Sequence, residues 1–490
     1  SVGLYYQVLD ASGTELLEPD GKQIFWGLSG DAIEGQYTIL PRQNDSVIIW
    51  QDTRFANDGS RIFFQFLTED GTTTLETNGR PVTLQGGGSQ EYPQAVVNDN
   101  GEIALVWVDK RDDDPNIYAQ LIGVNGERLW GDNGIKITAE QSLAQLDPKI
   151  SYHNGSFYIG WSNWDPIAGT FVYHVHGQRI MNNEKLWGPN GTMISVLTGD
   201  DVFSECILTD IIDDIYVWHR TNSMSTGSAQ TIWAKRVAED GTAYAGWEEA
   251  GLQASDVENL MLQAQNLPVA AATPQGIVIT WKDLRAGFMQ YYAQHITGAG
   301  QILWDPEGLQ IAANDLEQEF ADLTVTDHGI IAAWCEIVDG EHDIRAQKFS
   351  FPGIPLWASL GNAVAVKDSS QSTPNLLSFD DNGILVTWAD YLAPDPDIYY
   401  NYLNNNGQLV FPGTGLVLSS AIKAQLEPKG CVLNNNAYVV WADGRSGGKT
   451  VIMGLYVQKL NNETVSNEDP IAPGLQNPKL GQNYPNPFNP

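Results

Sequence analysis

One tryptophan-centred phrase recurs along the whole chain, and this repeat constrains the fold more than any other feature. In each copy a short run of mainly apolar residues leads into a tryptophan, as in Val-Ile-Ile-Trp50 and Ala-Leu-Val-Trp107. The copies are centred on Trp50, Trp107, Trp161, Trp218, Trp281, Trp334, Trp388 and Trp441, and successive copies are 53 to 63 residues apart. A repeat of this length is typical of propellers and solenoids, in which each copy is one supersecondary unit.

A single copy reads as four short strands. In the second repeat, apolar residues 95–97 and 103–107 flank the turn residues 98–101, which predicts a hairpin. A polar loop, 109–115, leads to residues 116–121, and the Asn125-Gly126 turn precedes residues 127–130. No helical period interrupts these strands, so the unit has the form of a propeller blade.

Two further positions recur in the repeats. A Gln-x-x-Pro phrase precedes the first strand of several copies, where proline suits a strand start. A second tryptophan ends the copy at Trp130, Trp187, Trp304 and Trp357, and Phe411 replaces it in the seventh copy. Aromatic residues at equivalent blade positions are expected to pack between neighbouring sheets.

The sequence therefore predicts an all-β propeller over residues 1–462, with eight four-stranded blades and seven as the alternative. The segment 4–9 resembles the second half of a repeat, whereas the last repeat stops at residues 455–460. Pairing of the two terminal strands is expected to close the ring and remove an open sheet edge. One strand is represented twice, around Tyr5 and Tyr456, which leaves the details of closure open.

The composition is strongly acidic. The formal net charge is −34, from 60 Asp and Glu against 26 Lys and Arg. Such a surface repels nucleic acids, so a nucleic acid partner is not expected. The acidity indicates either solubility in an extracellular or salty setting or the binding of divalent cations such as Ca²⁺.

Cysteine usage and the N-terminus add two expectations. Cys206, Cys335 and Cys431 lie in different repeats and are odd in number, which predicts no disulfide framework and three buried, unreactive thiols. The chain opens at Ser1 without an apolar leader and has no run of 18 apolar residues, as expected of a secreted protein after loss of its signal peptide.

The C-terminal end differs from the repeats. Residues 463–479 are polar and proline-containing, which predicts a linker. The last phrase contains Leu480, Gln482, Asn483, Tyr484, Pro485, Asn486, Pro487, Phe488, Asn489 and Pro490. It resembles the start of the C-terminal sorting domain of type IX secretion substrates. The resemblance covers only 480–490, and it implies recognition by the secretion machinery, export across an outer membrane, and release or attachment at the cell surface.

The repeats themselves are similar to secreted propeller modules found upstream of such sorting domains and, more loosely, to the TolB-type propeller repeat. These similarities favour the propeller fold and imply no catalytic residues.

An Asp-x-Arg step follows the repeat tryptophan in four copies, at Asp52/Arg54, Asp109/Arg111, Asp283/Arg285 and Asp443/Arg445. The two side chains could pair or cap the turn. Because a single active site must break the symmetry that structural residues keep, we interpret this step as structural.

Asymmetric loops are better candidates for a site. Asp112, Asp113 and Asp114 place three carboxylates in one loop, which could bind Ca²⁺ or form a solvated acidic turn. Two smaller acidic groups, Asp395/Asp397 and Asp339/Glu341/Asp343, carry the same pair of alternatives. His174 and His176 share one face of a strand, but no third metal ligand is evident nearby.

The third and fourth repeats depart most from the pattern after the tryptophan. Trp164 in the third repeat and His219 with Arg220 in the fourth are expected on one face of the propeller. A tryptophan beside polar side chains suits carbohydrate stacking, and drift in a tolerant loop is the alternative.

No nucleophile elbow, zinc-protease motif, phosphate loop or dinucleotide fingerprint occurs. We therefore favour a non-enzymatic, secreted cell-surface propeller that binds or scaffolds a glycan or protein. The alternatives are an extracellular polysaccharide hydrolase or lyase and a subunit of a surface filament or layer. Carboxylates converging with an Arg or His and a flanking tryptophan from different blades would favour the enzyme, and a channel ringed by the repeated glutamines and small residues would favour the binding module.

Overall fold

The structure is a computed structural model of the 490-residue chain. It describes all residues except 1, 9–21, 28–31, 55–58, 69–71, 85–86, 113, 140–143, 168–169, 196–199, 210–211, 225–226, 257–263, 380–382, 393, 412, 421, 435, 444–453 and 462–490. Within a few strands only the backbone is described, at 2–8, 22–27, 32–35, 165–167, 170–171, 200–209, 212–214, 222–224, 227–228 and 454–461. The linker 463–479 and the sorting motif 480–490 lie outside the described residues.

The described strands pair into eight sheets, which we call blades 1 to 8. In blades 1 to 7 the paired strands are antiparallel and nearly all are neighbours in chain order, and we call the strands of each blade a to d from the first strand onward. Blade 1 contains β3 (Ala32–Pro41), β4 (Asp45–Asp52), β5 (Arg61–Thr68) and β6 (Arg80–Pro81), and blade 2 contains β7 (Gln90–Val97), β8 (Ile103–Asp109), β9 (Asn116–Ile122) and β10 (Ile135–Lys136). Blade 3 contains β11 (Gln145–His153), β12 (Ser156–Ile167), β13 (Thr170–Met181), β14 (Glu184–Lys185) and β15 (Thr192–Met193). Blade 4 contains β16 (Asp200–Thr209), β17 (Ile212–Met224), β18 (Gly227–Arg236) and β19 (Leu252–Gln253).

Blades 5 to 8 follow the same order. Blade 5 contains β20 (Gln265–Thr273), β21 (Gly276–Asp283), β22 (Gln290–Thr297) and β23 (Leu309–Gln310), and blade 6 contains β24 (Gln318–Thr326), β25 (Gly329–Val338), β26 (Glu341–Phe349) and β27 (Asn362–Ala365). Blade 7 contains β28 (Gln371–Ser378), β29 (Ile384–Asp390), β30 (Asp397–Leu403) and β31 (Leu416–Ser419). Blade 8 contains β32 (Gln425–Leu433), β33 (Asn436–Asp443), β34 (Gly454–Asn461), β1 (Val2–Val8) and β2 (Lys22–Gly27). No α-helix occurs among the described residues.

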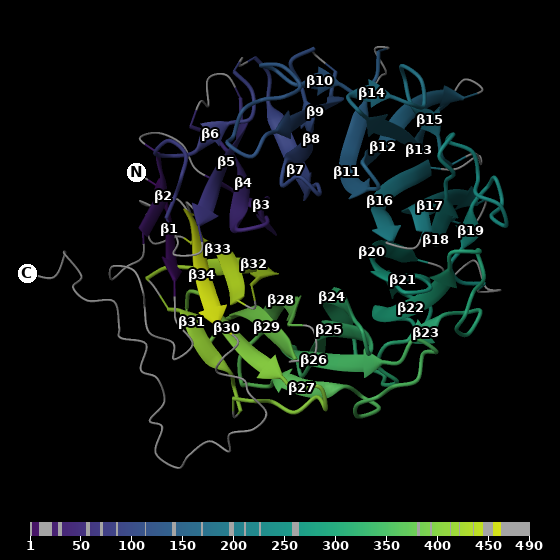
Figure 1. The fold of residues 1–490 in the computed structure, drawn as a ribbon. Helices are drawn as coiled ribbons and strands as arrows, with labels where there is room; N and C mark the ends of the chain where they lie inside the picture. The colour runs from purple at the N-terminus through teal and green to yellow at the C-terminus, as the bar shows by residue number, and fades with distance from the viewer. Residues whose placement is uncertain are drawn as a thin grey trace, which may run out of the picture.

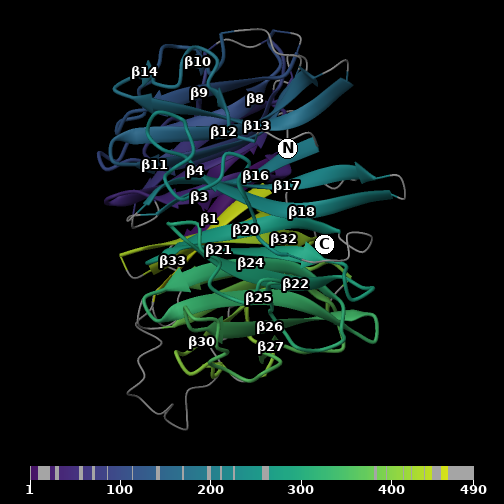
Figure 2. The same ribbon diagram turned by 90° about the vertical axis from the view of Figure 1, so that its right-hand side faces the viewer.

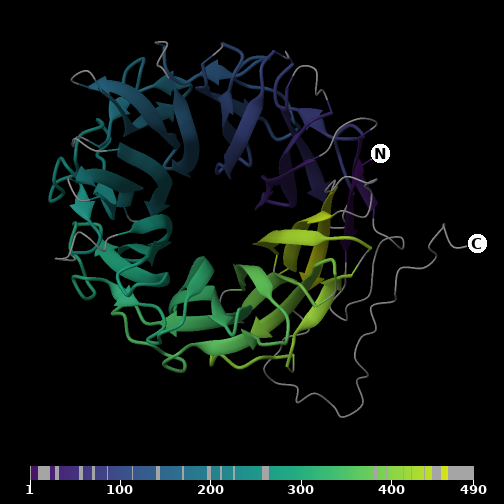
Figure 3. The same cartoon turned by 180° about the vertical axis from the view of Figure 1, so that it is seen from behind.

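The blades are arranged as a ring, and the predicted all-β propeller fold is confirmed. Figure 1 shows the a strands β3, β7, β11, β16, β20, β24, β28 and β32 nearest the centre, with the later strands of each blade farther out. The view from behind shows the same ring (Figure 3), and the side view shows the sheets twisted and laid against one another (Figure 2).

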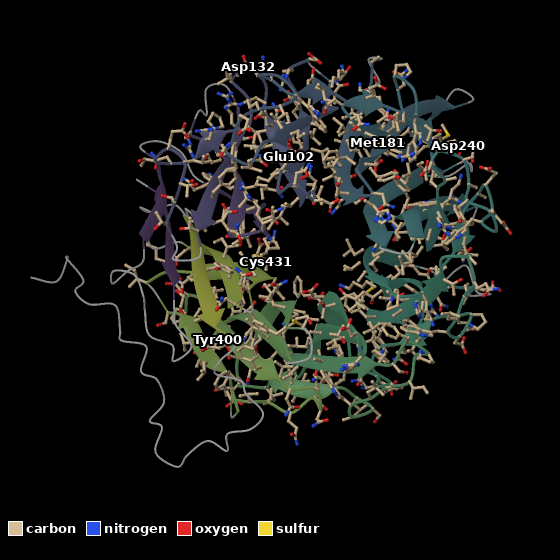
Figure 4. All side chains as sticks on the ribbon, viewed as in Figure 1. Glu102, Asp132, Met181, Asp240, Tyr400 and Cys431 are labelled. Atoms are coloured by element: carbon tan, nitrogen blue, oxygen red, sulfur yellow. The ribbon has the colours of Figure 1, made fainter. Side chains whose placement is uncertain are left out.

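The repeat explains why each sheet is buried on both faces. All seven residues of β8 are buried, because its alternate side chains pack against the blades on either side. Side chains fill the spaces between neighbouring blades around the ring (Figure 4). The repeat tryptophan needs a neighbour without a side chain: Gly308 has φ +89°, and a Cβ there would lie 2.8 Å from the Trp281 ring.

The second tryptophan of the repeat joins successive blades, as predicted. Trp130, Trp187 and Trp304 are buried, and their indole nitrogens donate hydrogen bonds to the next blade. For example, Trp304 Nε1 donates to the Phe351 carbonyl oxygen at 2.9 Å. These residues are therefore part of the packing between blades.

The N-terminal and C-terminal strands meet in blade 8. β1 pairs in parallel with β34, with Gln7 opposite Gln458 and Val8 opposite Lys459. The sheet order is β2-β1-β34-β33-β32, so the strand of Tyr5 and the strand of Tyr456 both belong to this sheet. Their apparent duplication in the sequence corresponds to a fifth strand.

No described segment forms a helix that is long and apolar enough to cross a membrane.

Candidate functional site

The repeated Asp-x-Arg step forms a structural unit at the end of strand b. In blade 2, Trp107 Nε1 donates to Asp109 Oδ2 at 2.7 Å, and the Arg111 guanidinium pairs with the same carboxylate at 2.5 Å. Arg111 also lies 4.2 Å from the centroid of the Tyr118 ring, on which Trp107 stacks. The aromatic rings, the carboxylate and the guanidinium thus fix the loop that follows.

Other blades keep this unit with the same or substituted groups. Arg54 pairs with Asp52 at 2.6 Å, and Arg285 with Asp283 at 2.5 Å. In blade 7 a lysine from another position replaces the arginine, with Lys367 Nζ 2.7 Å from Asp390. The structural interpretation is confirmed for the described copies, whereas Arg445 lies outside the described residues.

The repeated glutamines connect neighbouring blades. Gln265 accepts a hydrogen bond from the Ile232 amide of blade 4 and donates to Asp283 of its own blade at 3.0 Å. The Gln-x-x-Pro glutamines that the structure describes are buried, so they do not ring the centre of the propeller. A centre ringed by these glutamines, the arrangement that would have favoured the binding module, is therefore not found among the described residues.

A ring of variable side chains lies directly after these glutamines. We call the end of the sheets where the a strands begin the upper face. There the third residue of the Gln phrase has a positive φ of 49° to 57° in six blades. These ring residues are Tyr92, Asp147, Leu267, Phe320, Thr373 and Glu427.

The left-handed backbone of each ring residue coincides with a break in the ladder between strands a and b. In blade 6, for example, the register shifts between Glu319 and Asp322. Such a conformation costs a non-glycine residue roughly 1–3 kcal/mol and persists only where the surroundings enforce it. The side chains nevertheless differ in every blade, and Tyr92, Leu267 and Phe320 are 50%, 64% and 47% exposed.

Blades 5 and 6 bring four unlike side chains together on the upper face. Lys282 Nζ of β21 lies 3.2 Å from Glu319 Oε1 of β24, and His342 Nε2 of β26 lies 3.3 Å from Glu319 Oε2. The rings of Phe320 and His342 are 6.4 Å apart. We call Lys282, Glu319, Phe320 and His342 the blade 6 cluster.

The electrostatics of the blade 6 cluster favour an ionised Glu319. Burial acts to raise the pKa of Glu319, but its hydrogen bonds and charge interactions with Lys282 and His342 outweigh burial, so the pKa is lowered. An ionised Glu319 accepts a hydrogen bond from the Nε2 proton of His342. In neutral His342 the Nδ1 atom is then a hydrogen-bond acceptor. The cluster can therefore accept a proton or hydrogen bond beside an exposed aromatic ring.

Blade 2 has a related arrangement. Glu91 and Tyr92 stand at the same two positions of the Gln phrase as Glu319 and Phe320. Lys110 Nζ of the b–c loop lies 2.7 Å from Glu91 Oε2. We call Glu91, Tyr92 and Lys110 the blade 2 cluster.

The residues predicted to bind a ligand lie elsewhere, on blades 3 and 4. Trp164 stacks on Tyr173, with ring centroids 6.3 Å apart, and His219 is half-buried near the upper end of β17. Arg220 is buried, with its guanidinium 4.2 Å from the centroid of Trp233. Arg220 therefore contacts a strand c aromatic residue as the structural arginines of other blades do, and ligand binding by these three residues stays a prediction.

The acidic loop predicted to bind Ca²⁺ is only partly described. Asp112 accepts hydrogen bonds from the Tyr118 hydroxyl at 2.7 Å and from Lys136 at 3.2 Å, and these two groups lower its pKa. Asp114 is exposed, and Asp113 lies outside the described residues. Among the residues that the structure describes, no group of three or more His, Cys, Asp or Glu could hold a metal ion.

The remaining acidic groups and the two histidines make other contacts. Glu341 accepts a hydrogen bond from Ser370 at 2.5 Å, and the pKa of Asp397 is raised to about 6 by burial and by neighbouring carboxylates. His174 is buried, and His176 lies against Trp161, with ring centroids 5.9 Å apart. Ca²⁺ binding therefore stays a prediction.

The sequence did not identify the blade 6 cluster. Its four residues come from three strands of two blades, and only the register between blades brings them together. Glu319 and Phe320 belong to a Gln phrase that lacks its proline, and in the same repeat Glu336 replaces the aspartate after Trp334.

No protein-family model matches the chain, and no curated protein is significantly similar to it. Among solved structures, the polysaccharide lyase Uly1 is 10% identical with a TM-score of 0.44, covering 94% of this chain and 98% of its own. An ulvan lyase of polysaccharide lyase family 25 is 8% identical with a TM-score of 0.44, covering 89% and 96%. A protein of unknown function from Dyadobacter fermentans is 11% identical with a TM-score of 0.38, covering 76% and 95%. With TM-scores below 0.5, these likenesses carry no argument about the activity of this chain.

Proposed function

We propose that this chain is a secreted binding propeller and that the upper face holds its ligand. The observation that carries the proposal is the ring of residues that share one enforced backbone conformation and differ in side chain. A purely structural position would keep one residue type, as the repeat tryptophan does. Variable side chains on a constant scaffold, several of them exposed, are the arrangement by which binding surfaces are built.

The secreted, cell-surface setting rests on the sequence. The phrase at 480–490 resembles a type IX sorting signal, and the acidic composition suits an extracellular protein. An acidic surface disfavours polyanionic partners, which leaves neutral glycans and proteins as the ligand classes.

The test is a screen of the purified chain on immobilised glycans and polysaccharides, with Ca²⁺ and with chelator. The variant Leu267→Glu places a charge in the ring and is expected to weaken binding at least about tenfold, since a buried unpaired charge is costly. Leu356→Glu is the matched control, because Leu356 is 50% exposed on a c–d connection at the opposite end of the sheets. Equal loss in both variants would refute a ligand site at the ring, and failure to retain any glycan here or any protein in a matching screen would refute the proposal.

An enzyme acting on extracellular polysaccharide is the second candidate. The blade 6 cluster favours it, since a carboxylate that orients a histidine is a common proton-transfer arrangement. Product analysis of every retained polysaccharide tests this candidate. Cleavage that His342→Ala abolishes would replace the binding module with the enzyme, and intact polysaccharide after long incubation would exclude the enzyme for the ligands tested.

A further inference from the structure

We infer that the upper face holds two matching sugar subsites, the blade 2 cluster and the blade 6 cluster, that bind one neutral polysaccharide chain. This inference rests on the proposed function and specifies its ligand class and contact residues. Each cluster contains an exposed aromatic ring residue, the glutamate before it and a lysine bound to that glutamate.

The aromatic residues are held ready to stack on a sugar. Tyr92 and Phe320 have φ values of 57° and 49°, so the backbone that carries each ring is already set and need not be ordered on binding. Tyr92 is held further by its amide, which donates to Gln51 Oε1 of blade 1 at 3.1 Å. A flat apolar ring beside polar groups matches a pyranose, which has apolar C–H faces and a polar edge.

The polar groups beside each ring match sugar hydroxyls. Lys110 and Lys282 supply ammonium donors, and Glu91 and Glu319 supply carboxylate acceptors. In its neutral form, His342 adds an Nδ1 acceptor in the blade 6 cluster alone, so we expect that subsite to be the stronger one.

The charge balance points to a neutral sugar. In each cluster the lysine is paired with a glutamate, so no unpaired cation remains to bind a uronate or sulfate group. The chain as a whole carries a net charge of −34, which repels an acidic polymer.

The two clusters lie on opposite sides of the ring. β7, which carries Tyr92, and β24, which carries Phe320, face each other across the centre in Figure 1. Of the six ring residues, only these two are aromatic. One extended polysaccharide lying across the upper face could engage both, and the second contact would then be intramolecular.

Calorimetry on the full chain tests the two subsites by stoichiometry. The probes are barley β-glucan, xylan and galactomannan as neutral polymers, alginate and polygalacturonate as acidic ones, and the trisaccharide of whichever polymer binds. We expect two trisaccharides per wild-type chain, one for Tyr92→Ala, one for Phe320→Ala and none for the double variant. Tyr92→Phe and Phe320→Tyr should keep both sites, since the stacking face is retained.

Polymer binding tests whether one polysaccharide chain contacts both subsites at once. Each single alanine variant should weaken binding of the polymer at least about tenfold through loss of the second contact. Leu356→Ala is the matched control at an exposed leucine on the opposite end of the sheets, and it should bind as wild type does. Unchanged thermal melting of each variant excludes misfolding.

The outcomes separate this inference from the proposed function. Binding of a neutral polymer that neither Tyr92→Ala nor Phe320→Ala changes would overturn the subsites and leave the proposed function standing. Retention of acidic polymers alone would overturn the ligand class. Failure to bind any polysaccharide or protein would overturn the proposed function itself.

Discussion

Replacement of Asp109 tests whether the repeated Trp-Asp-Arg unit stabilises the blades through its buried hydrogen bonds. The Asp109 carboxylate is buried and accepts hydrogen bonds from Trp107 Nε1 at 2.7 Å, Gln90 Nε2 at 3.3 Å and Arg111 Nη2 at 2.5 Å. Asp109→Ala leaves the indole and amide donors buried without this acceptor, at a cost of about 1–3 kcal/mol each. Arg111 is partly exposed and can be hydrated, so we expect a total loss of about 4 kcal/mol.

Asp109→Asn separates the contribution of the buried hydrogen bonds from that of the ion pair with Arg111. In blade 3, Asn163 stands at this position, and its Oδ1 accepts from both Trp161 Nε1 and Gln145 Nε2 at 3.2 Å. An asparagine in blade 2 should therefore keep both buried donors satisfied and lose only the charged pairing with Arg111. We expect a cost of about 1 kcal/mol, since that pairing is partly exposed.

Urea unfolding of the three proteins measures these costs as changes in unfolding free energy. Asp315→Ala is the control, because Asp315 is exposed, and its cost should stay within about 0.5 kcal/mol. If Asp109→Asn destabilises the protein as much as Asp109→Ala, the buried donors are not the source of the stability and this reasoning is refuted.

Three further predictions concern titration, thiol reactivity and the contacts between blades. Burial first, and then neighbouring carboxylates, raise the pKa of Asp397 to about 6, so the stability it contributes is present below about pH 4 and is lost as the pH rises through 6. After discounting for solvent exposure, Asp397→Asn should raise the unfolding free energy by about 1 kcal/mol at pH 7.5 and change it little at pH 4. Thermal melting at the two pH values measures this difference. Burial raises the thiol pKa of Cys335 and of Cys431 to about 12. A Cys206→Ser variant should therefore show no thiol that reacts with Ellman's reagent at pH 8 until the protein is unfolded. Rapid labelling of the folded protein would contradict the described burial. Gln265→Ala removes a buried link between blades 4 and 5 and should cost about 2–3 kcal/mol in urea unfolding, whereas a loss below about 0.5 kcal/mol would mean that these glutamines do not hold the blades together.

The sequence predicted the propeller because each blade is a local unit. Turn residues and apolar runs specify the four strands of a copy. The repeat tryptophan, such as Trp107 in blade 2, shows that the copies are equivalent. The Asp109–Arg111 pairing could also be predicted, because its partners are two residues apart. Nothing beyond the repeat itself was needed for either result.

The blade 6 cluster could not be predicted in the same way. Lys282 and His342 are 37 and 23 positions from Glu319, and they meet it only because of how two sheets pack. The ring was also hidden, since a positive φ is usually signalled by glycine or asparagine and here falls on residues such as Phe320. Their backbone is set by the ladder around them, and the residue type gives no sign of it.

The ring also bears on how such a protein could change its specificity. Because the surrounding ladder already imposes the strained backbone, exchanging one non-β-branched side chain for another at Tyr92 or Phe320 adds little new strain. Binding preference can therefore drift, or be selected from a library at the six ring positions, while the melting temperature of the scaffold stays nearly constant. Glycine at any of these positions would relieve roughly 1 kcal/mol of backbone strain and remove the side chain that contacts the ligand. At each ring position, a change that stabilises the fold therefore weakens binding.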